Sequence, residues 1–411
     1  MKSLVLIAMR LVLIAMQLVL IAMLSTPSFA QATRGAAAVQ APKKNATPTA
    51  EFSGAAELDS TINEAIRQDK LPGGVLLVGH SGKIVYRKAY GRRSLTGTKE
   101  PMTVDTIFDL ASLTKIVATT SAMMRLYEQG RLDLDAPVTK YLPEFQGGES
   151  PITIRELMTH FSGFRPDIDI DPPWSGYETG IRMAMMDKPV APPNTKFIYS
   201  DTNFILLGEI ARRLSGKPEN EYVADILFKP LGMKDTRYLP PASWRPRIAP
   251  TEMQADGTVL RGVVHDPRAR WMGGVAGHAG LFSTGDDLAK FCTLILDEGA
   301  GLFAPATIRT FTSPASPKDN PVVRGLGWDI NSPYSGTRGD LFPIGSFGHT
   351  GFTGTSMWID PASRTFVIFL ANSVHPHLRP AITPLRRKIA TIVAASVGYA
   401  PRNAAAAPSA N

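Results

Sequence analysis

The sequence predicts an α+β fold in which an antiparallel sheet, flanked by N- and C-terminal helices, carries an inserted, mainly helical subdomain. Two strand pairs near the ends of the chain, within residues 73–90 and 355–372, are each joined by a short turn and predict β-hairpins. The stretch between them, roughly 112–300, has mainly helical periodicity and long loops rich in proline and glycine. Since the sheet is then completed by residues distant in sequence, we expect a cleft between the sheet and the helical block.

The first 30 residues differ from the rest of this 411-residue chain. After Ser3, the hexapeptide Leu-Val-Leu-Ile-Ala-Met occurs three times, and Arg10 interrupts the apolar run. A charge inside a membrane span is costly, whereas Lys2 and Arg10, followed by an apolar segment and small residues up to Ala30, are typical of a signal peptide. We therefore predict a signal peptide over residues 1–30, cleaved near Ala30, in preference to an uncleaved anchor.

Export would place the protein in the periplasm or outside the cell, without stable membrane insertion after cleavage. Removal of residues 1–30 takes away Lys2 and Arg10 and no acidic residue, so the formal net charge falls from +8 to +6. The basic residues are spread along the chain, so nucleic acid is a poor candidate partner, and anionic cell-wall material is compatible with the charge but not implied by it. The single cysteine, Cys292, has apolar neighbours and predicts a buried helix cysteine. The sequence leaves the oligomeric state open.

One domain is expected over residues 53–398, preceded by a disordered linker at 31–52 and followed by a loose tail at 399–411. Its composition, with 44% hydrophobic and 19% charged residues in the whole chain, suits a globular protein with a large core. A capping box of Thr153 and Glu156 predicts where one helix begins. We predict helices at about 55–69, 153–160, 204–214, 286–296 and 380–397, strands at 73–79, 84–90, 326–330, 355–360 and 364–372, and an irregular loop over 166–196.

The first stretch that suggests chemistry is Ser112-Leu113-Thr114-Lys115, at the start of a predicted buried helix that ends near Gly130. Residues three apart share a helix face, so Ser112 and Lys115 are expected side by side. A serine nucleophile needs a group that takes its proton, and a nearby lysine helps if burial lowers its pKa. The pattern alone also fits a helix N-terminal serine followed by a solvated lysine.

Two further stretches carry groups that fit the same chemistry. Tyr199-Ser200-Asp201 precedes a helix, and a phenol beside a cationic amine is favoured in its ionised form, which can act as a base. His349-Thr350-Gly351 lies in a glycine-rich entry to a strand, where Phe352 can present its backbone N–H and His349 can hold a carboxylate or polarise the site. Taken singly, each stretch also fits a structural role: a buried tyrosine before a helix cap, and a strand-entry loop with an incidental histidine.

Together the three stretches resemble the active-site motifs of the serine β-lactamase and penicillin-binding protein superfamily: Ser-x-x-Lys, then Tyr-x-Asn or Ser-x-Asn, then Lys-Thr-Gly or His-Thr-Gly. The resemblance runs from about residue 55 to 397 and includes the loop stretches 159–164 and 273–284. The version with tyrosine is most similar to class C β-lactamases, the related D-alanyl-D-alanine carboxypeptidases and the related esterases. The resemblance implies the β-lactamase/DD-peptidase-like fold and a serine hydrolase that acts on a small-molecule or peptidoglycan-type substrate.

For the mechanism, the resemblance implies two-step acyl transfer. Ser112 attacks a carbonyl, Tyr199 takes and returns the proton while paired electrostatically with Lys115, and water then releases the acyl group. The N–H groups of Ser112 and Phe352 would form the oxyanion hole. The expected substrate-binding and oxyanion residues are Asp201, His349, Thr350, Gly351 and Phe352.

Two residues depart from the pattern of the β-lactamases. Asp201 stands where they carry asparagine, and an ionised aspartate cannot donate to a substrate amide. His349 stands where they carry lysine, and a neutral imidazole binds a carboxylate weakly. Both departures count against efficient β-lactam hydrolysis and favour an esterase, a peptidase or an amidase.

The leading interpretation is an exported serine hydrolase that acts through a covalent acyl-enzyme on an ester, amide or β-lactam carbonyl; the sequence does not choose among these substrates. The alternative is a penicillin- or peptidoglycan-binding sensor whose Ser112 is acylated but turns over poorly. His160 is expected to cap or brace a helix end, and His265 and His278 to make structural hydrogen bonds. The pair His375 and His377 lacks a second ligand cluster, so we expect neither a metal nor a cofactor.

Overall fold

The computed structural model describes residues 52–148 and 151–400. The predicted signal peptide at 1–30, nearly all of the predicted linker at 31–52 and most of the predicted tail at 399–411 lie outside the described residues. Among the helices of the described part, none combines the length and the apolar character needed to cross a membrane.

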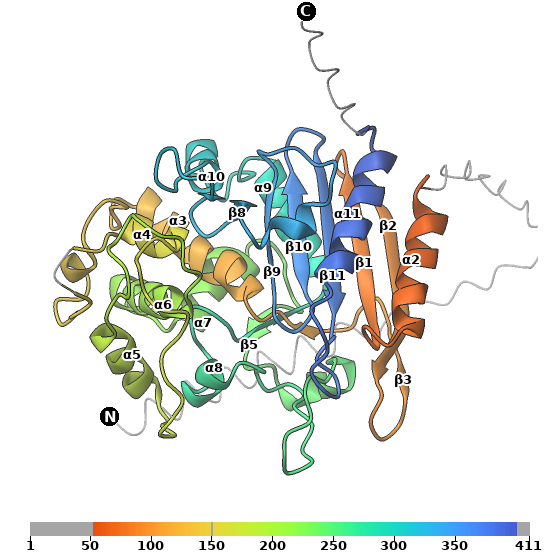
Figure 1. The fold of residues 1–411 in the computed structure, drawn as a ribbon, viewed down its shortest axis with the longest axis horizontal. Coiled ribbons are helices and arrows are strands. Elements are labelled where there is room, and N and C mark those ends of the chain that lie inside the picture. Colours follow the sequence, from red (N-terminus) through yellow and green to blue (C-terminus); the bar gives the residue numbers. More distant parts are fainter. Residues whose placement is uncertain (1–51, 149–150, 401–411) are drawn as a thin grey trace, which may run out of the picture. The chain divides into compact units, whose positions relative to one another are not determined.

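The main sheet formed by the described residues is antiparallel, with the strand order β3-β2-β1-β11-β10-β9-β8-β7. β1 pairs with β11, from Gly74 opposite Ala371 to His80 opposite Thr365, so segments far apart in the sequence complete one sheet, as predicted (Figure 1). The two predicted hairpins are β1–β2 and β10–β11. The strands are β1 (Gly73–His80), β2 (Lys83–Ser94), β3 (Glu100–Pro101), β7 (Val323–Arg324), β8 (Asp329–Asn331), β9 (Phe347–Thr350), β10 (Ser356–Asp360) and β11 (Thr365–Ala371).

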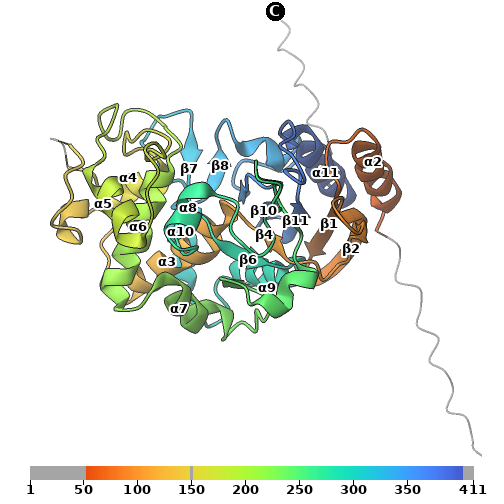
Figure 2. The ribbon, with the colours of Figure 1, turned by 90° about the horizontal axis from the view of Figure 1, so that it is seen from below.

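Two helices, α2 (Ala55–Arg67) and α11 (Thr383–Ser396), cover one face of this sheet side by side (Figures 1 and 2). Alternation along β1 sends Leu76 and Val78 into the core under these helices, while the residues between them enter the larger core on the opposite face. α9 (Gly285–Leu296) packs against β1 and β11 on that opposite face and carries the buried Cys292, as predicted.

The inserted block is mainly helical, as predicted, but it also contains strands of the small antiparallel sheet β4-β6-β5. These strands are two or three residues long, too short for a periodic sequence signal. Their bounds are β4 (Phe108–Asp109), β5 (Arg237–Tyr238) and β6 (Leu281–Ser283). Two π-helical segments are η1 (Lys115–Thr119) and η3 (Ala224–Phe228). The α-helices are α3 (Thr120–Glu128), α4 (Ile154–Thr159), α5 (Tyr177–Met186), α6 (Asp201–Ser215), α7 (Glu219–Val223), α8 (Pro267–Trp271) and α10 (Pro305–Thr312).

Local signals located several of these elements. The capping box of α4 is present: Thr153 Oγ accepts from the Glu156 N–H, and the Glu156 carboxylate accepts from the Thr153 N–H. α6 ends at Gly216 in the left-handed conformation (φ 72°), where glycine is favoured.

Two element predictions were wrong. The loop predicted over 166–196 contains α5, whose buried face is short and whose flanks are rich in proline and aspartate. The strand predicted at 326–330 begins only at Asp329, because Gly327 (φ 87°) turns the chain between β7 and β8. A Cβ at Gly327 would lie 2.2 Å from Thr120 Oγ1, so the turn packs directly against α3.

Candidate active site

Ser112 lies in a sharp turn between β4 and η1. The residue before it, Ala111, has a left-handed backbone (φ 47°), which costs roughly 1–3 kcal/mol for a residue with a side chain. The buried Asp109 carboxylate holds this turn by accepting from the N–H of Ala111 at 2.9 Å and from the N–H of His265 at 2.7 Å. The strand end and its buried acid therefore fix where Ser112 is presented.

Lys115 lies directly behind Ser112 and is fully buried. Its Nζ is 2.9 Å from Ser112 Oγ, 3.1 Å from the carbonyl oxygen of His278 and 2.7 Å from Asp201 Oδ1. Burial lowers the pKa of Lys115, but the Asp201 carboxylate and Tyr199 raise it more, so the pKa lies above its usual value and the amine is protonated. The condition stated from the sequence, a lysine pKa lowered by burial, is not met, because the Asp201 carboxylate lies against the ammonium.

Tyr199 faces the same pair from the loop before α6. Its ring stacks on His160, with centroids 4.4 Å apart and planes 29° apart, and its centroid is 5.2 Å from Lys115 Nζ. Burial raises the pKa of Tyr199; the Lys115 charge and hydrogen bonds with Ser112 and Lys115 oppose the rise, and Asp201 adds to it. The phenol is therefore protonated near neutral pH. His160 also ends α4 in the left-handed conformation, the bracing role that was predicted.

Asp201 is the first residue of α6, where the helix N-terminus favours a negative charge. Its carboxylate pairs with the Lys115 ammonium, and its side chain is 19% exposed. The prediction that Asp201 contacts substrate stays a prediction; its observed partner is Lys115.

A cavity of about 420 Å³ opens over Ser112. Its wall contains the following predicted site residues: Ser112, Tyr199, His349, Thr350, Gly351 and Phe352. Lys115 and Asp201 are not part of this wall and lie behind it. A larger and more open hollow of about 710 Å³ lies over α7, η3 and β5 and contains no predicted site residue, so we place the candidate site in the smaller cavity.

His349 is 4% exposed at the end of β9 and is uncharged. Burial, with the nearby Arg324 and Lys115 charges, holds its pKa well below the usual value. Its Nδ1 lies 2.8 Å from the carbonyl oxygen of Thr350, so we place the hydrogen on Nδ1, and Nε2 has no partner among the described residues. His349 thus presents a neutral ring to the cavity. If the substrate carries a carboxylate, the positive charge that pairs with it must come from another residue.

The loop after β9 lies against the Ser112 turn. Thr353 Oγ1 donates to the carbonyl oxygen of Asp109 at 2.8 Å, and Thr355 Oγ1 donates to that of Leu110 at 2.9 Å. Within the described chain, the backbone N–H groups of Ser112 and Phe352 have no protein acceptor. Two segments far apart in sequence are therefore joined where two free N–H donors are available for an oxyanion.

The cavity wall also holds charged residues that sequence reasoning missed. Arg324 and Asp329 pair across β7 and β8, with Nη1 and Oδ1 3.3 Å apart. Arg386 of α11 donates to the carbonyl oxygens of Gly351 and Thr355 at 3.0 and 2.9 Å, and no carboxylate among the described residues pairs with it. Burial lowers the pKa of Arg386 to about 10. A single arginine in a helix or a short strand carries no motif, so no sequence signal could have found these two.

Comparisons with known proteins agree with this architecture. The model of the Beta-lactamase family matches residues 58–391. A protein of Escherichia coli K12, provisionally named D-alanyl-D-alanine carboxypeptidase, is 33% identical over 341 residues, which cover 73% of this chain and 78% of that protein.

Two solved structures share the fold. EstCE1 is described as a hydrolase with promiscuous acyltransferase activity. Its structure matches with a TM-score of 0.68 at 21% identity, and the match covers 84% of this chain and 99% of the EstCE1 chain. The octameric penicillin-binding protein homologue from Pyrococcus abyssi matches with a TM-score of 0.66 at 26% identity, and the match covers 80% of this chain and 76% of the homologue.

The predicted resemblance and the predicted fold class are both confirmed by these matches. The match spans the sheet, the inserted block and all three motif stretches. This chain belongs to the beta-lactamase family and is a serine hydrolase related to the β-lactamases.

Proposed function

We propose that Ser112 is the nucleophile of a two-step acyl transfer that hydrolyses an ester, amide or β-lactam carbonyl through a covalent acyl-enzyme. The observation that carries the proposal is the 2.9 Å contact between Lys115 Nζ and Ser112 Oγ, beside Tyr199 at the cavity wall. A buried cation aimed at a hydroxyl lowers the cost of forming an alkoxide there.

In this mechanism Lys115 acts as a fixed cation and Tyr199 as the general base. Because Asp201 keeps Lys115 protonated, Lys115 cannot take the proton of Ser112. The ionised form of Tyr199, whose share grows as the pH rises toward its raised pKa, takes this proton as Oγ bonds to the substrate carbonyl carbon. The N–H groups of Ser112 and Phe352 would stabilise the oxyanion, each donor contributing about 3–4 kcal/mol. Tyr199 then returns the proton to the leaving group, and water releases the acyl group by the reverse proton path.

For the substrate we favour a peptide or ester with a carboxylate near the scissile bond, such as a peptidoglycan-type D-amino-acid peptide. The carboxypeptidase name of the E. coli relative points the same way. Arg386 supports it, because a buried guanidinium without a carboxylate partner is stabilised by an anionic ligand.

A sensor that is acylated and turns over poorly is the second candidate. It is favoured by Asp201, which occupies a position where an amide donor would orient substrate in a β-lactamase. A fluorescent penicillin separates the two functions, because a stable adduct without turnover favours the sensor and repeated turnover favours the enzyme.

The experiment that tests the hydrolase is a substrate panel of p-nitrophenyl acetate, nitrocefin and a D-Ala-D-Ala peptide. The wild-type protein is expected to turn over at least one of them and Ser112→Ala none. Ser313→Ala, which changes an exposed serine beyond the cavity wall, is the matched control and should keep full activity. Retained turnover in Ser112→Ala would contradict the proposal.

We also propose that the protein is exported to the periplasm, with cleavage near Ala30, because of the charged and apolar pattern of residues 1–30. N-terminal sequencing of protein from the periplasmic fraction should begin at Gln31. Recovery of intact Met1 in the membrane fraction would favour the uncleaved anchor.

A further inference from the structure

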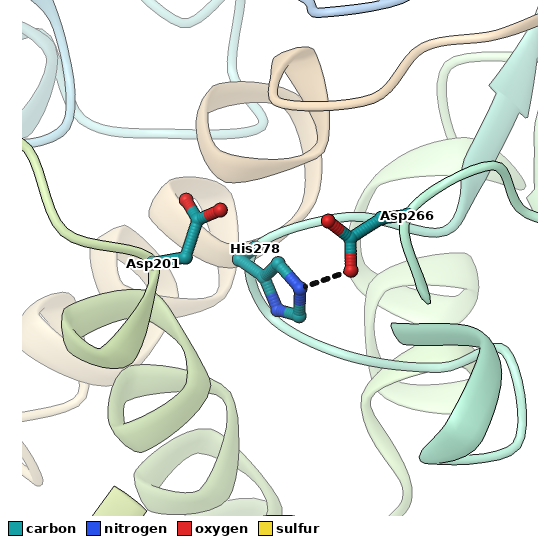
Figure 3. A group of neighbouring side chains, drawn as sticks. All are labelled: Asp201, Asp266 and His278. Carbon is teal, nitrogen blue, oxygen red and sulfur yellow. Dashed lines mark hydrogen bonds and ion pairs between the residues drawn. The ribbon is translucent and has the colours of Figure 1, made fainter. Parts of the chain in front are cut away.

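A cluster of two partly buried acids and one buried histidine lies behind Lys115. Figure 3 shows His278 between Asp201 and Asp266, and one polar atom of each of these side chains lies within 4.8 Å of the others. The three come from different parts of the fold: Asp201 begins α6, Asp266 is the N-cap residue just before α8, and His278 lies in the loop before β6.

His278 touches the catalytic lysine through its backbone and an acid through its ring. Its carbonyl oxygen accepts from Lys115 Nζ at 3.1 Å, while its Nε2 lies 2.9 Å from Asp266 Oδ1. The His278 side chain is fully buried, so the Asp266 contact fixes its ring without competition from water. Asp266 is itself held, because it caps α8 by accepting from the N–H of Ala269 at 2.8 Å.

The charges of the cluster alternate in sign. Burial lowers the pKa of His278, but the charges of Asp266 and Asp201 together raise it by more, so the pKa lies above its usual value. Burial raises the pKa of Asp266, and His278 lowers it more, so that carboxyl stays ionised. Groups of opposite sign therefore alternate through the cluster: the Lys115 ammonium pairs with Asp201, and Asp266 favours the protonated form of the His278 ring that lies between the two acids.

Other titratable groups also face this cluster. Asp167 interacts with Asp201 and His278 and pairs with Arg268 at 2.9 Å; burial raises its pKa to about 7. Glu219 faces His278 from α7, and burial raises its pKa to about 7 as well. Both acids can change charge near neutral pH, so pH profiles of variants in this cluster must be compared with the wild-type profile.

Spacing alone would let Asp201, Asp266 and His278 ligate a divalent cation. The side chains that would bind a cation already have protein partners, since Asp201 pairs with the Lys115 ammonium and the His278 ring pairs with Asp266. The arrangement fits a network of paired protein charges.

We infer that His278 and Asp266 are positioning residues for Lys115 in the proposed acyl transfer. Asp266 fixes the His278 loop, and the His278 carbonyl holds the Lys115 ammonium toward Ser112. This inference rests on the proposed function of Ser112 and adds the residues that keep its cation in place.

The test compares His278→Gln and Asp266→Asn with the full-length wild-type protein, with p-nitrophenyl acetate as substrate. Both substitutions keep a hydrogen-bonding group of similar size but remove a charge. We expect kcat to fall roughly 10- to 100-fold with little change in KM, because Lys115 loses its alignment. For His278→Gln we also expect the rise of kcat with pH to move to higher pH, because the ring that can carry a positive charge beside Asp201 is gone and Tyr199 then ionises less easily.

His375→Gln is the matched control. His375 is also fully buried, but its ring bonds only the backbone of Leu95 and Thr251. This variant should lose thermal stability and keep the wild-type pH profile.

The outcomes distinguish the two proposals. Full turnover by Ser112→Ala overturns the proposed function. Loss of turnover in Ser112→Ala, together with a wild-type kcat and pH profile in folded His278→Gln, overturns only the positioning role. A thermal midpoint that rises with added Zn²⁺ in the wild type but not in Asp266→Asn would show a metal site and would also overturn it.

Discussion

The two sides of the candidate active site differ in how their charges are balanced. Behind Ser112, the charges of Lys115 and Asp201 lie 2.7 Å apart, in a cluster whose signs alternate. In the cavity wall, His349 is neutral and Arg386 has no acidic partner among the described residues. The charge behind Ser112 is thus balanced by a neighbouring acid, whereas the wall carries a positive charge without an acidic partner among the described residues. This difference suggests that the chemistry is built in and that the wall selects an anionic group.

The largest effect is expected from Lys115→Met. Activity should fall by roughly 10⁴-fold, and removal of one partner of a buried ion pair should lower the free energy of unfolding by about 3–5 kcal/mol. Urea titration and ester hydrolysis measure the two effects. The double variant Lys115→Met/Asp201→Asn should recover stability without activity; recovery of both would show that the cation is dispensable.

Tyr199→Phe should lower kcat by roughly 10²- to 10⁴-fold, because it removes the general base. The ring and its stacking on His160 remain, so the thermal midpoint should change little. A stopped-flow measurement of acylation between pH 6 and pH 10 checks this. Near wild-type acylation in Tyr199→Phe would assign the base to another group.

Arg386→Met tests the cavity wall. Turnover of substrates with a carboxylate should fall by roughly 10- to 100-fold, the usual worth of a hydrogen bond to a charged group, while a neutral p-nitrophenyl ester should be affected far less. Arg387→Met, which changes an exposed arginine paired with Asp340, is the matched control. Equal losses on charged and neutral substrates would mean that Arg386 only supports the loop after β9.

The smallest change is expected from Asp201→Asn. Asp201 raises the pKa of both Lys115 and Tyr199, so its neutralisation lowers both and lets Tyr199 ionise at lower pH. The rise of kcat/KM with pH should therefore move to lower pH. The same variant restores the amide donor of the β-lactamase pattern, so nitrocefin hydrolysis should rise relative to ester hydrolysis. A shift to higher pH would contradict the assigned roles.

Much of the fold could be predicted because its signals are local. Strand-forming runs joined by short turns over 73–90 and 355–372 located the hairpins, and the Thr153–Glu156 capping box located α4. α10 and the small sheet β4-β6-β5 were missed, because these elements are short and are stabilised by tertiary packing.

At the site, Ser112, Tyr199 and His349 could be found because they belong to ordered motifs. The partners that set their charges could not. The Lys115–Asp201 pair joins residues 86 positions apart, and Arg324, Arg386 and the His278–Asp266 pair meet the site only through the fold. A sequence motif predicts which groups react, whereas the pKa values of these groups depend on neighbours that only the tertiary structure brings close.

The central claim is the covalent acyl-enzyme on Ser112, and peptide mapping tests it most directly. The wild-type protein is mixed with p-nitrophenyl acetate or a fluorescent penicillin, quenched in acid and digested with trypsin. An acyl adduct is expected on the tryptic peptide 100–115, in which Ser112 is the only serine. No adduct is expected on this peptide from Ser112→Ala. An adduct on any other peptide, or turnover without an adduct in the wild type, would contradict it.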